Sequence, residues 1–373
     1  MLVNYAEVRE KHLLPFTAKL KQVYAKPQKT VIIAHNDSDG ITSAIIFSKI
    51  LDSFGLKYKK DYSVYFGDNE LRKAELPETH ELIKEIKSSA VVIYLDYRTV
   101  HAQNTGKKVF IVDHHNKSNL TGYKDATWYY PLNGEIYRPS ASAFCYDIYK
   151  ELLGQNHDVK LMATIGAVGD SMLPNSLDYL DIKELEQPFF VGRQISWYFF
   201  NAQRIFCLAG DNKSCLEIYN LLLEKLENKT LNDLTALPES IESRIYKQLR
   251  KDNDVVSRFK GRLETYEDLK VMFLEMTPAE AGSKDAIFGY VWLYYPGYLC
   301  VIHINFKGIA SLSMRSNTYD ILDVFEKVQN KLPELNFGGH PFAAGGKIEN
   351  SKVPLLKDLI IAELKTGKIK SIN

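Results

Sequence analysis

Three residues that could bind a metal ion occur at alternate positions near the start of the chain. His35, Asp37 and Asp39 directly follow an apolar run at 31–34, and Gly40 opens a new apolar segment. A short apolar run with polar flanks is typical of a buried parallel strand. If the chain stays extended past this strand, alternate side chains share a face and the three groups converge. The alternative is a polar turn in which Asp37 or Asp39 caps the next helix.

Further acids and histidines follow later apolar segments. Asp96 comes directly after an apolar run at 90–95, an Asp-His-His sequence at 113–115 follows another such run, and Asp170 ends a helical pattern. In an open parallel sheet, ligands bind beyond the carboxyl ends of the strands. We therefore expect these side chains to lie close to those at 35–39.

The spacing of apolar residues divides the chain into alternating strands and helices, as in βαβ units. In the N-terminal part it predicts strands at 31–34, 62–66, 90–95 and 107–112, and helices at 5–25, 41–54, 79–88, 139–153 and 158–170. Nearer the C-terminus it predicts strands at 271–274, 298–304 and 309–314, a helix at 321–332 and a glycine-rich loop at 336–346.

The predicted fold class is α/β. We expect an N-terminal catalytic domain with a parallel sheet at 1–185, a helical connector or insertion at 186–265, and a smaller C-terminal α/β domain at 266–373. The active-site cleft would lie between the two domains.

The composition excludes several classes of protein. In this chain of 373 residues, 47 Lys and Arg balance 46 Asp and Glu, so a nucleic-acid partner would need a local basic groove. No segment approaches the roughly 18 apolar residues of a membrane span, and the N-terminus lacks the pattern of a secretory signal. The four cysteines include no Cys-x-x-Cys pair, which argues against a zinc knuckle and fits a reducing compartment. We expect a cytoplasmic protein.

The types of side chain indicate which ions the predicted site would bind. The candidate ligands are His35, Asp37, Asp39, Asp96, His114 and Asp170. Carboxylates with one or two imidazoles suit Mn²⁺, Mg²⁺ or Fe²⁺ better than Zn²⁺, which favours thiolates. Their number fits two ions that share a bridging carboxylate. Two ions about 3.5–4 Å apart suit in-line displacement at phosphorus, with a bridging water acidified enough to attack near neutral pH.

At four places the sequence resembles the motifs of the DHH phosphoesterase superfamily. The motifs are His35-Asn-Asp37-Ser-Asp39-Gly40, the isolated Asp96, Asp113-His114-His115 and Gly166-Ala-Val-Gly-Asp170. Each is modest alone, but the ordered set is highly specific. The C-terminal part resembles the DHH-associated C-terminal domain, and together the resemblance covers 28–185 and 268–365. Within the superfamily the chain is most similar to RecJ-like single-strand exonucleases of the archaeal type.

The resemblance implies a ligand set for two Mn²⁺ ions, with Mg²⁺ as the alternative. Asp96 would bridge the two ions. The other ligands of the first ion would be Asp39, His114 and Asp170, and Asp37 would bind the second.

The resemblance also implies roles for three neighbouring residues. Asp113 would orient the ligand histidine, and His115 would bind the scissile phosphate or assist the leaving group. His35 departs from the pattern of the pyrophosphatase and nano-RNase branches, in which the first histidine lies four residues before the first aspartate. Bacterial RecJ has an aspartate at this offset, and we expect His35 to be a metal ligand.

In the C-terminal domain, the resemblance implies residues that hold a phosphate or the terminal nucleotide of the substrate. They are Arg315, Ser316, Gly338, Gly339 and His340. Backbone N–H groups of a glycine-rich loop can hold an anion, and arginine suits two-point contact with phosphate. Taken alone, the glycines would indicate an ordinary tight turn.

The function that the resemblance implies is exonuclease hydrolysis of single-stranded DNA, RNA or both to 5′-mononucleotides, by attack of a water held between two metal ions. Two alternatives stay open. One is a nano-RNase or a phosphodiesterase for linear or cyclic dinucleotides. The other is an active nuclease that binds a replisome protein through the connector at 186–265.

Overall fold

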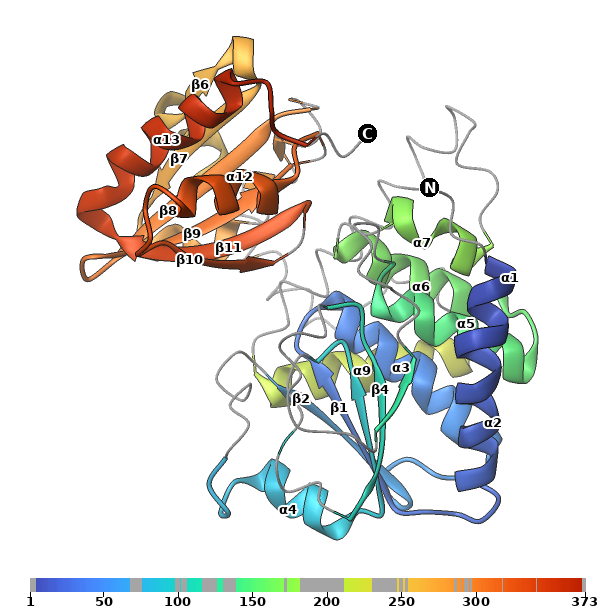
Figure 1. The fold of residues 1–373 in the computed structure, drawn as a ribbon. Coiled ribbons are helices and arrows are strands. Elements are labelled where there is room, and N and C mark those ends of the chain that lie inside the picture. Colours follow the sequence, from blue (N-terminus) through green and yellow to red (C-terminus); the bar gives the residue numbers. More distant parts are fainter. Residues whose placement is uncertain are drawn as a thin grey trace. The chain divides into compact units, whose positions relative to one another are not determined.

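The computed structural model of the chain is drawn in Figure 1. It describes residues 5–67, 76–97, 101, 106–115, 126–129, 139–170, 173–181, 211–229, 247, 251, 254–284, 287–288, 290–291, 295, 297–316, 318–339 and 341–370. The chain divides into two compact units, Met1–Ile241 and Glu242–Asn373. Each unit contains its own sheet.

The first unit is built on a five-stranded parallel sheet with the strand order β2-β1-β3-β4-β5. Its strands are β1 (Thr30–His35), β2 (Tyr62–Gly67), β3 (Val91–Leu95), β4 (Lys108–Val112) and β5 (Thr127–Tyr129). The first four are the strands that the sequence predicts, and they are confirmed. With 3 residues, β5 is too short to give a recognisable pattern.

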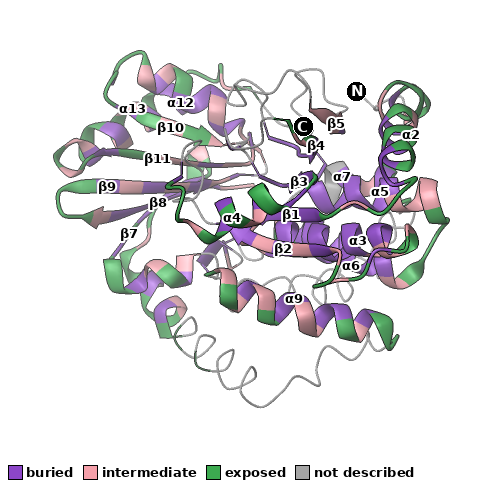
Figure 2. Cartoon of the chain, turned by 90° about the horizontal axis from the view of Figure 1, so that it is seen from below, coloured by how far each residue is buried: buried purple, intermediate pink, exposed green. Residues whose placement is uncertain are grey.

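Helices cover both faces of this sheet. On one face, α4 (Glu81–Ser88) packs against apolar side chains of β1, β3 and β4. On the other face lie α3 (Ser38–Ser53) and α5 (Ala141–Leu153), and α6 (His157–Gly169) packs against both of them. The other helices among the described residues of this unit are α1 (Tyr5–Val8), a π-helical turn (Arg9–Leu13), α2 (Leu14–Val23), α7 (Leu173–Leu180) and α9 (Asn212–Glu227). Figure 2 shows that β1, β3 and α3 are largely buried, whereas α9 keeps an exposed face.

The single helix predicted at 5–25 is interrupted by the π-helical turn. A π turn changes the hydrogen-bond spacing locally, which a search for helical periodicity does not reveal. Near this turn, Tyr5 donates a hydrogen bond to the buried carboxylate of Asp147, and Arg9 contacts both carboxylate oxygens of Glu151. These contacts tie the first helices to α5.

Three helices of the first unit approach one another closely at Gly166. A Cβ atom there would lie 2.2 Å from Thr42 Oγ1 on α3 and 2.4 Å from Ser142 Oγ on α5. Only glycine therefore permits this separation of the helix backbones. The approach matters for the helix ends, because α3 carries Asp39 in its first turn and α6 ends at Asp170.

The second unit contains a six-stranded mixed sheet with the order β10-β11-β9-β8-β7-β6. Its strands are β6 (Glu264–Tyr266), β7 (Val271–Met276), β8 (Leu299–Phe306), β9 (Ile309–Arg315), β10 (Asn336–Gly339) and β11 (Ala343–Glu349). α12 (Ile321–Gln329) and α13 (Val353–Lys365) cover one face of it. Short 3₁₀ turns occur at Lys260–Arg262, Glu267–Leu269, Pro278–Ser283 and Asn350–Lys352. The predicted α/β class is thus confirmed in both units.

The prediction of a glycine-rich loop at 336–346 is wrong. The described residues of this segment form β10 and the start of β11, which pair antiparallel with Gly339 opposite Ala344. Glycine is depleted in strands generally, so the sequence pattern favours a loop. Here the absence of a side chain permits close pairing, because a Cβ on Gly339 would lie 2.5 Å from the carbonyl oxygen of Ala343.

Parts of the predicted connector at 186–265 pack against each unit. α9 packs against α3 and β2 in the first unit. Val255 and Phe259 are buried in the core of the second unit. The domain boundaries at 185 and 265 stay predictions, and the division between the units falls at Ile241 and Glu242.

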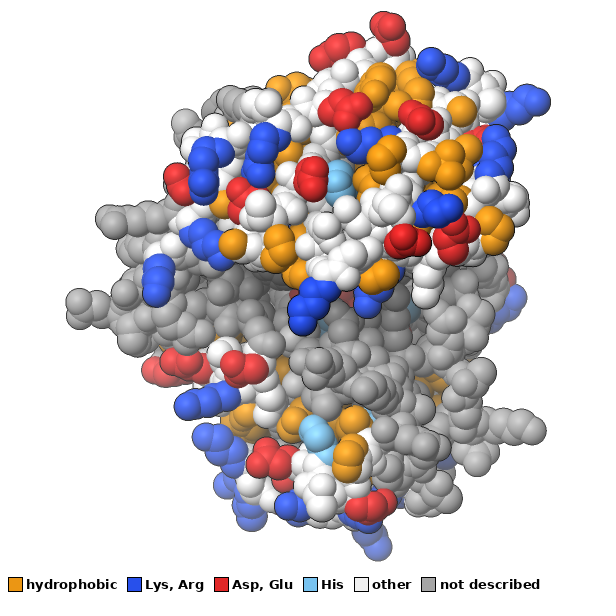
Figure 3. Space-filling model, turned by 90° about the vertical axis from the view of Figure 1, so that its left-hand side faces the viewer, with side chains coloured by type: hydrophobic (Ala, Val, Ile, Leu, Met, Phe, Trp, Pro, Cys, Tyr) orange, Lys and Arg blue, Asp and Glu red, His pale blue; other side chains and the backbone are white. Residues whose placement is uncertain are grey.

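Charged side chains of both signs are mixed on the face of the molecule drawn in Figure 3. On the face in Figure 3, lysine and arginine side chains lie among aspartate and glutamate side chains, with apolar side chains between them. This mixture agrees with the balance of 47 basic and 46 acidic residues in the sequence. None of the helices in the described ranges has the length and apolar character needed to cross a membrane.

We predict that Gly166→Ala destabilises the first unit. The added Cβ overpacks the contact between three helices, which costs about 1–3 kcal/mol and exceeds the gain of about 0.5–1 kcal/mol for replacing a helical glycine. Calorimetric unfolding should therefore show a lower midpoint. Gly261→Ala is the control, because a Cβ there meets no atom within 4 Å. An unchanged midpoint for Gly166→Ala would contradict the close approach of the helices.

Candidate metal centre

The first part of the site is the junction between β1 and α3. Asp37 is extended, with φ −125° and ψ −173°, and its Oδ1 accepts the N–H of Gly40 at 2.9 Å. Asp37 therefore caps α3, while its Oδ2 lies 2.6 Å from His35 Nδ1. A Cβ on Gly40 would lie 2.2 Å from the carbonyl oxygen of His35, so only glycine fits this junction.

The expectation that the chain stays extended as far as Asp39 is wrong. α3 begins at Ser38, so Asp39 lies in the first turn of the helix. The cap formed by Asp37 ends the extended segment, and alternation of side chains no longer applies beyond it. The two interpretations of the sequence are therefore compatible, since one aspartate both caps the helix and faces His35.

Asp39 is completely buried and is held by the start of α5. Its Oδ2 accepts the N–H of Ala141 at 2.8 Å, and its Oδ1 accepts the N–H of Ser142 at 2.9 Å. N–H groups in the first turn of a helix have no partner within it and favour a nearby negative charge. The sequence predicts this helix, but no local pattern links its first residues to Asp39.

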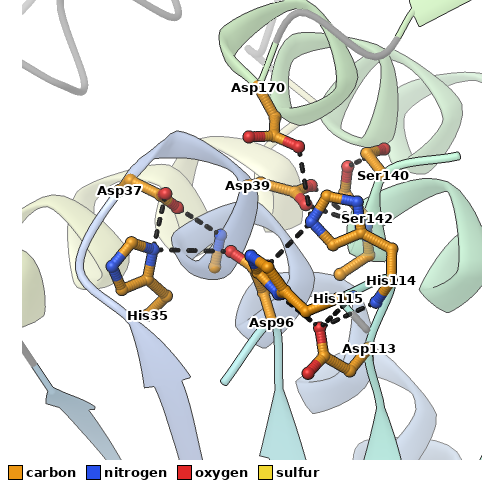
Figure 4. A network of polar contacts seen from close by, with 12 residues as sticks. His35, Asp37, Asp39, Asp96, Asp113, His114, His115, Ser140, Ser142 and Asp170 are labelled. Atoms are coloured by element: carbon orange, nitrogen blue, oxygen red, sulfur yellow. Dashed lines mark hydrogen bonds and ion pairs between the residues drawn. The ribbon is translucent and has the colours of Figure 1, made fainter. Parts of the chain in front are cut away.

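Asp96 lies at the centre of the cluster (Figure 4). It directly follows β3, is buried, and has a left-handed backbone with φ 53°. Its Oδ2 lies 3.6 Å from His35 Nδ1. Its Oδ1 lies 3.2 Å from His114 Nε2 and 3.5 Å from His115 Nδ1. The carboxylate of Asp96 thus lies between three imidazole rings.

Asp113 organises the two histidines that follow it after β4. Its Oδ1 accepts the backbone N–H of His114 at 2.7 Å and that of His115 at 3.0 Å, and lies 2.6 Å from His115 Nδ1. Burial raises the pKa of Asp113, but the interaction with His115 outweighs burial and holds the pKa below its usual value. The carboxylate thus contacts the backbone of the predicted ligand histidine and the ring of the next histidine.

Asp170 completes the cluster from the end of α6, where its Oδ2 lies 3.4 Å from His114 Nε2. The described side chains form three groups whose ligand atoms lie within 4.8 Å of one another. These groups are Asp96, Asp113, His114 and His115; His35, Asp37 and Asp96; and Asp39, His114 and Asp170. The fold therefore brings together every predicted site residue of the N-terminal part.

The histidines of the cluster bind protons more strongly than usual. Burial lowers the pKa of His35, but Asp37 and Asp96 outweigh burial and raise the pKa to about 9. Burial also lowers the pKa of His114, but the carboxylates of Asp170, Asp96 and Asp39 raise it to about 10. Both imidazoles therefore lie in an excess of negative charge.

The same excess of negative charge affects the pKa values of the carboxylates. Burial raises the pKa of Asp39 well above its usual value, and the charges of Asp96 and Asp170 raise it further. Burial raises the pKa of Asp96 as well, but contacts with His114 and His35 hold it well below its usual value. Asp96 therefore keeps its negative charge in the middle of the cluster.

Divalent cations fit this cluster. Asp96 Oδ1 is buried and accepts no well-formed hydrogen bond from the described residues. Buried charge of one sign is costly unless it is paired, and a divalent cation supplies the missing positive charge. Carboxylate oxygens and imidazole nitrogens without thiolates are donors that suit Mn²⁺ or Mg²⁺.

Two family models match the chain. The model of the DHH family N-terminal domain matches residues 29–169, and the model of the DHHA1 domain matches residues 296–366. The chain belongs to the DHH family of phosphoesterases. The DHH match contains seven of the eight clustered residues and ends one residue before Asp170.

Solved structures share the fold of this DHH protein. RecJ from Thermus thermophilus with Mn²⁺ is 15% identical with a TM-score of 0.62, and the match covers 95% of this chain and 55% of that one. An exonuclease RecJ bound to manganese is 16% identical with a TM-score of 0.55, over 95% and 94% of the two chains. A pGpG-specific phosphodiesterase from Vibrio cholerae is 12% identical with a TM-score of 0.52, over 91% and 99%. This DHH chain thus spans about half the length of the Thermus protein. No curated protein sequence matches it.

The DHHA1 region contains the residues predicted to bind substrate. Arg315 ends β9 opposite Ala343, the first residue of β11. Its guanidinium lies 5.0 Å from the ring centroid of Phe288, which gives the cation an aromatic neighbour.

The other predicted substrate-binding residues lie on neighbouring segments. Ser316 is buried, and its Oγ accepts the N–H groups of residues 318 and 319. Gly338 and Gly339 form the end of β10, beside β11. His340 lies outside the described residues.

We predict that the affinity of this DHH protein for Mn²⁺ rises as the pH increases toward about 9, the raised pKa of His35. Because the raised pKa keeps the imidazole protonated at neutral pH, a cation must displace this proton to bind. Calorimetry at pH 7 in buffers of different ionisation enthalpy measures the number of protons released.

Two matched variants test whether the proton released on Mn²⁺ binding comes from His35. His35→Gln should lower proton release on Mn²⁺ binding, whereas His157→Gln, at an exposed position, should leave it unchanged. Binding of Mn²⁺ to the wild type without any proton release would contradict the prediction.

Proposed function

We propose that this chain is a divalent-metal-dependent phosphodiesterase that acts as a RecJ-like exonuclease on single-stranded DNA or RNA and releases 5′-mononucleotides. The observation that carries the proposal is the convergence of three ligand groups from distant segments, two of which share Asp96. Two ions that share a carboxylate suit hydrolysis of a phosphodiester, because they stabilise both the attacking and the leaving oxygen.

We assign Asp96 to both ions. The remaining ligands are Asp39, His114 and Asp170 for one ion, and His35 and Asp37 for the other. Bound ions neutralise charge on the scissile phosphate and lower the pKa of a water molecule. Mn²⁺ is the proposed metal, and the manganese in two matching RecJ structures supports this choice.

His115 is the proposed residue for proton transfer or phosphate contact. Asp113 Oδ1 lies 2.6 Å from His115 Nδ1, which orients the ring and stabilises its protonated form. Nε2 is then the nitrogen that can donate a hydrogen bond to a phosphate oxygen or a proton to the leaving group. His115 is 7% exposed, so it is not completely closed off from solvent.

In the second unit, we propose that Arg315 and the β10–β11 hairpin bind a phosphate or the end of the substrate. Glycines at 338 and 339 leave backbone groups of the hairpin uncovered by side chains, and Arg315 lies on the strand that pairs with β11. We extend this role to Ser316 and to His340.

A phosphodiesterase for dinucleotides is the second candidate. The match to the pGpG-specific phosphodiesterase covers 99% of that enzyme, whereas the match to Thermus RecJ covers 55%. The match to the other RecJ covers 94% of that chain, so the two candidates are separated by the substrates that the protein cleaves.

We predict that Asp96→Ala and Asp39→Ala abolish hydrolysis. Each substitution removes an anchoring carboxylate, and loss of a group that stabilises transition-state charge costs about 10²-fold or more in rate. Mn²⁺-dependent cleavage of a labelled oligonucleotide measures the effect. Asp178→Ala is the control, because this aspartate is exposed on α7. Full activity of Asp96→Ala would refute the proposed site.

A series of substrates distinguishes the two candidates. Single strands of DNA and of RNA, from dinucleotides to long oligomers and labelled at either end, are incubated with the protein and Mn²⁺. We expect long strands to be degraded at least as fast as dinucleotides, with mononucleotides released from one end. A marked preference for dinucleotides would favour the second candidate instead.

A further inference from the structure

The backbone of Asp96 is unusual because a left-handed conformation occurs at a buried position. Among the described residues, the other non-glycine positions with positive φ are exposed: Lys59, Asp181, Lys229, Lys270 and Lys307. A left-handed conformation costs an L-residue about 1–2 kcal/mol, and such strain persists where surrounding contacts impose it. The contacts around the segment that follows β3 account for this conformation of Asp96.

The left-handed turn reverses the alternation of side chains after β3. In a continuing strand, residues three positions apart point to opposite faces. Tyr94 and Tyr97 are three apart, yet both lie in the core cluster under α4, with ring centroids 6.1 Å apart and planes inclined by 29°. In a continuing strand Asp96 would share the face of Tyr94, whereas its carboxylate is directed at the histidines of the cluster (Figure 4).

Gly67 makes room for the ring of Tyr97. A Cβ on Gly67 would lie 2.5 Å from Tyr97 Oη and 2.7 Å from Tyr97 Cε2. Tyr97 is completely buried and its ring packs in the apolar cluster under α4. Gly67 ends β2 directly beside His35 in the sheet. The close approach of an aromatic ring, rather than an unusual φ, requires glycine here.

His101 makes a second set of contacts with the segment that contains Tyr94 and Tyr97. Tyr94 Oη lies 2.9 Å from His101 Nδ1 and accepts the backbone N–H of His101 at 3.2 Å. The imidazole ring also lies against the rings of Tyr94 and Tyr97, with centroid distances of 5.9 Å and 6.1 Å. The chain that leaves Asp96 is thus held on the α4 side of the sheet at two points.

We propose that Tyr97, held between Gly67 and Tyr94, is a positioning residue for the Asp96 carboxylate. This inference rests on the proposed function, because it concerns the carboxylate assigned to both ions. The buried ring keeps residue 97 on the α4 face and thereby keeps Asp96 left-handed. Without the ring, the backbone relaxes toward the strand conformation, which turns the carboxylate away from His114.

The test compares Tyr97→Leu and Gly67→Ala with a conservative and a destabilising control. Tyr97→Phe keeps the ring. Val92→Ala removes apolar volume from the same core cluster and the same strand without touching the site. Mn²⁺ affinity is measured by calorimetry, and spin coupling between paired Mn²⁺ ions by electron paramagnetic resonance, below the unfolding midpoint of every variant. Steady-state kinetics then separate kcat from KM.

We expect Tyr97→Leu and Gly67→Ala to bind Mn²⁺ about 10-fold or more weakly, the scale seen when a partner of a metal ligand is lost. They should also lose the spin-coupled signal, and kcat should fall while KM stays near its wild-type value. Tyr97→Phe should keep all three properties at their wild-type values. Val92→Ala should lower only the unfolding midpoint.

The inference is overturned if Tyr97→Leu and Gly67→Ala behave like Val92→Ala, with Mn²⁺ affinity and spin coupling unchanged. This outcome differs from failure of the proposed function. A wild type that binds a coupled pair of Mn²⁺ ions but cleaves no phosphodiester would refute the proposed function. The positioning inference would then still be tested by the Mn²⁺ affinity and the spin coupling of the variants. A wild type that binds no Mn²⁺ would overturn both.

Discussion

The structure depends on placing several carboxylates of like charge in one buried space. Two unit charges about 4 Å apart repel by about 4 kcal/mol at the effective dielectric constant near a protein surface. The fold compensates part of this repulsion with protons on His35 and His114, whose pKa values rise to about 9 and about 10. Backbone N–H groups at the start of α5 compensate Asp39. Divalent cations are the natural source of the remaining positive charge.

The parallel sheet and the packed helices together position the buried carboxylates and histidines. Three parallel strands end at one edge of the sheet and deliver His35, Asp96 and Asp113 to it. Asp39 and Asp170 come from helix ends, and their positions depend on how closely α3, α5 and α6 pack at Gly166. The strain at Asp96 fits the same pattern, since conformational cost at a site is offset by burial around it.

In the second unit, glycine allows two strands of a hairpin to pair closely. The β10–β11 hairpin uses small residues where backbone approaches backbone, and Arg315 ends the adjoining strand. Family models place a DHH domain and a DHHA1 domain on the same chain. One unit thus concentrates negative charge that suits cations, whereas the other places the cation of Arg315 on the strand beside the hairpin.

Much of the fold and of the site can be predicted from the sequence, because local patterns report local structure. Four strands of the first sheet follow from apolar runs, and a polar group at the end of each of three strands indicates a common edge. The residue types at these ends also indicate which class of ion would suit the site, since donor chemistry does not depend on the fold. The π-helical turn and the glycine-rich strands escape prediction because their residues favour other structures when considered alone.

Tertiary structure alone decided how the individual carboxylates are held. Asp39 was placed by N–H groups of residues 141 and 142, about a hundred positions away in sequence. The direction of Asp96 depends on a tyrosine ring resting against a glycine of another strand. Such contacts join segments that are distant along the chain, and no residue pattern in a single sequence records their distance in space. Sequence thus determines which chemical groups are available, whereas packing determines where their charges meet.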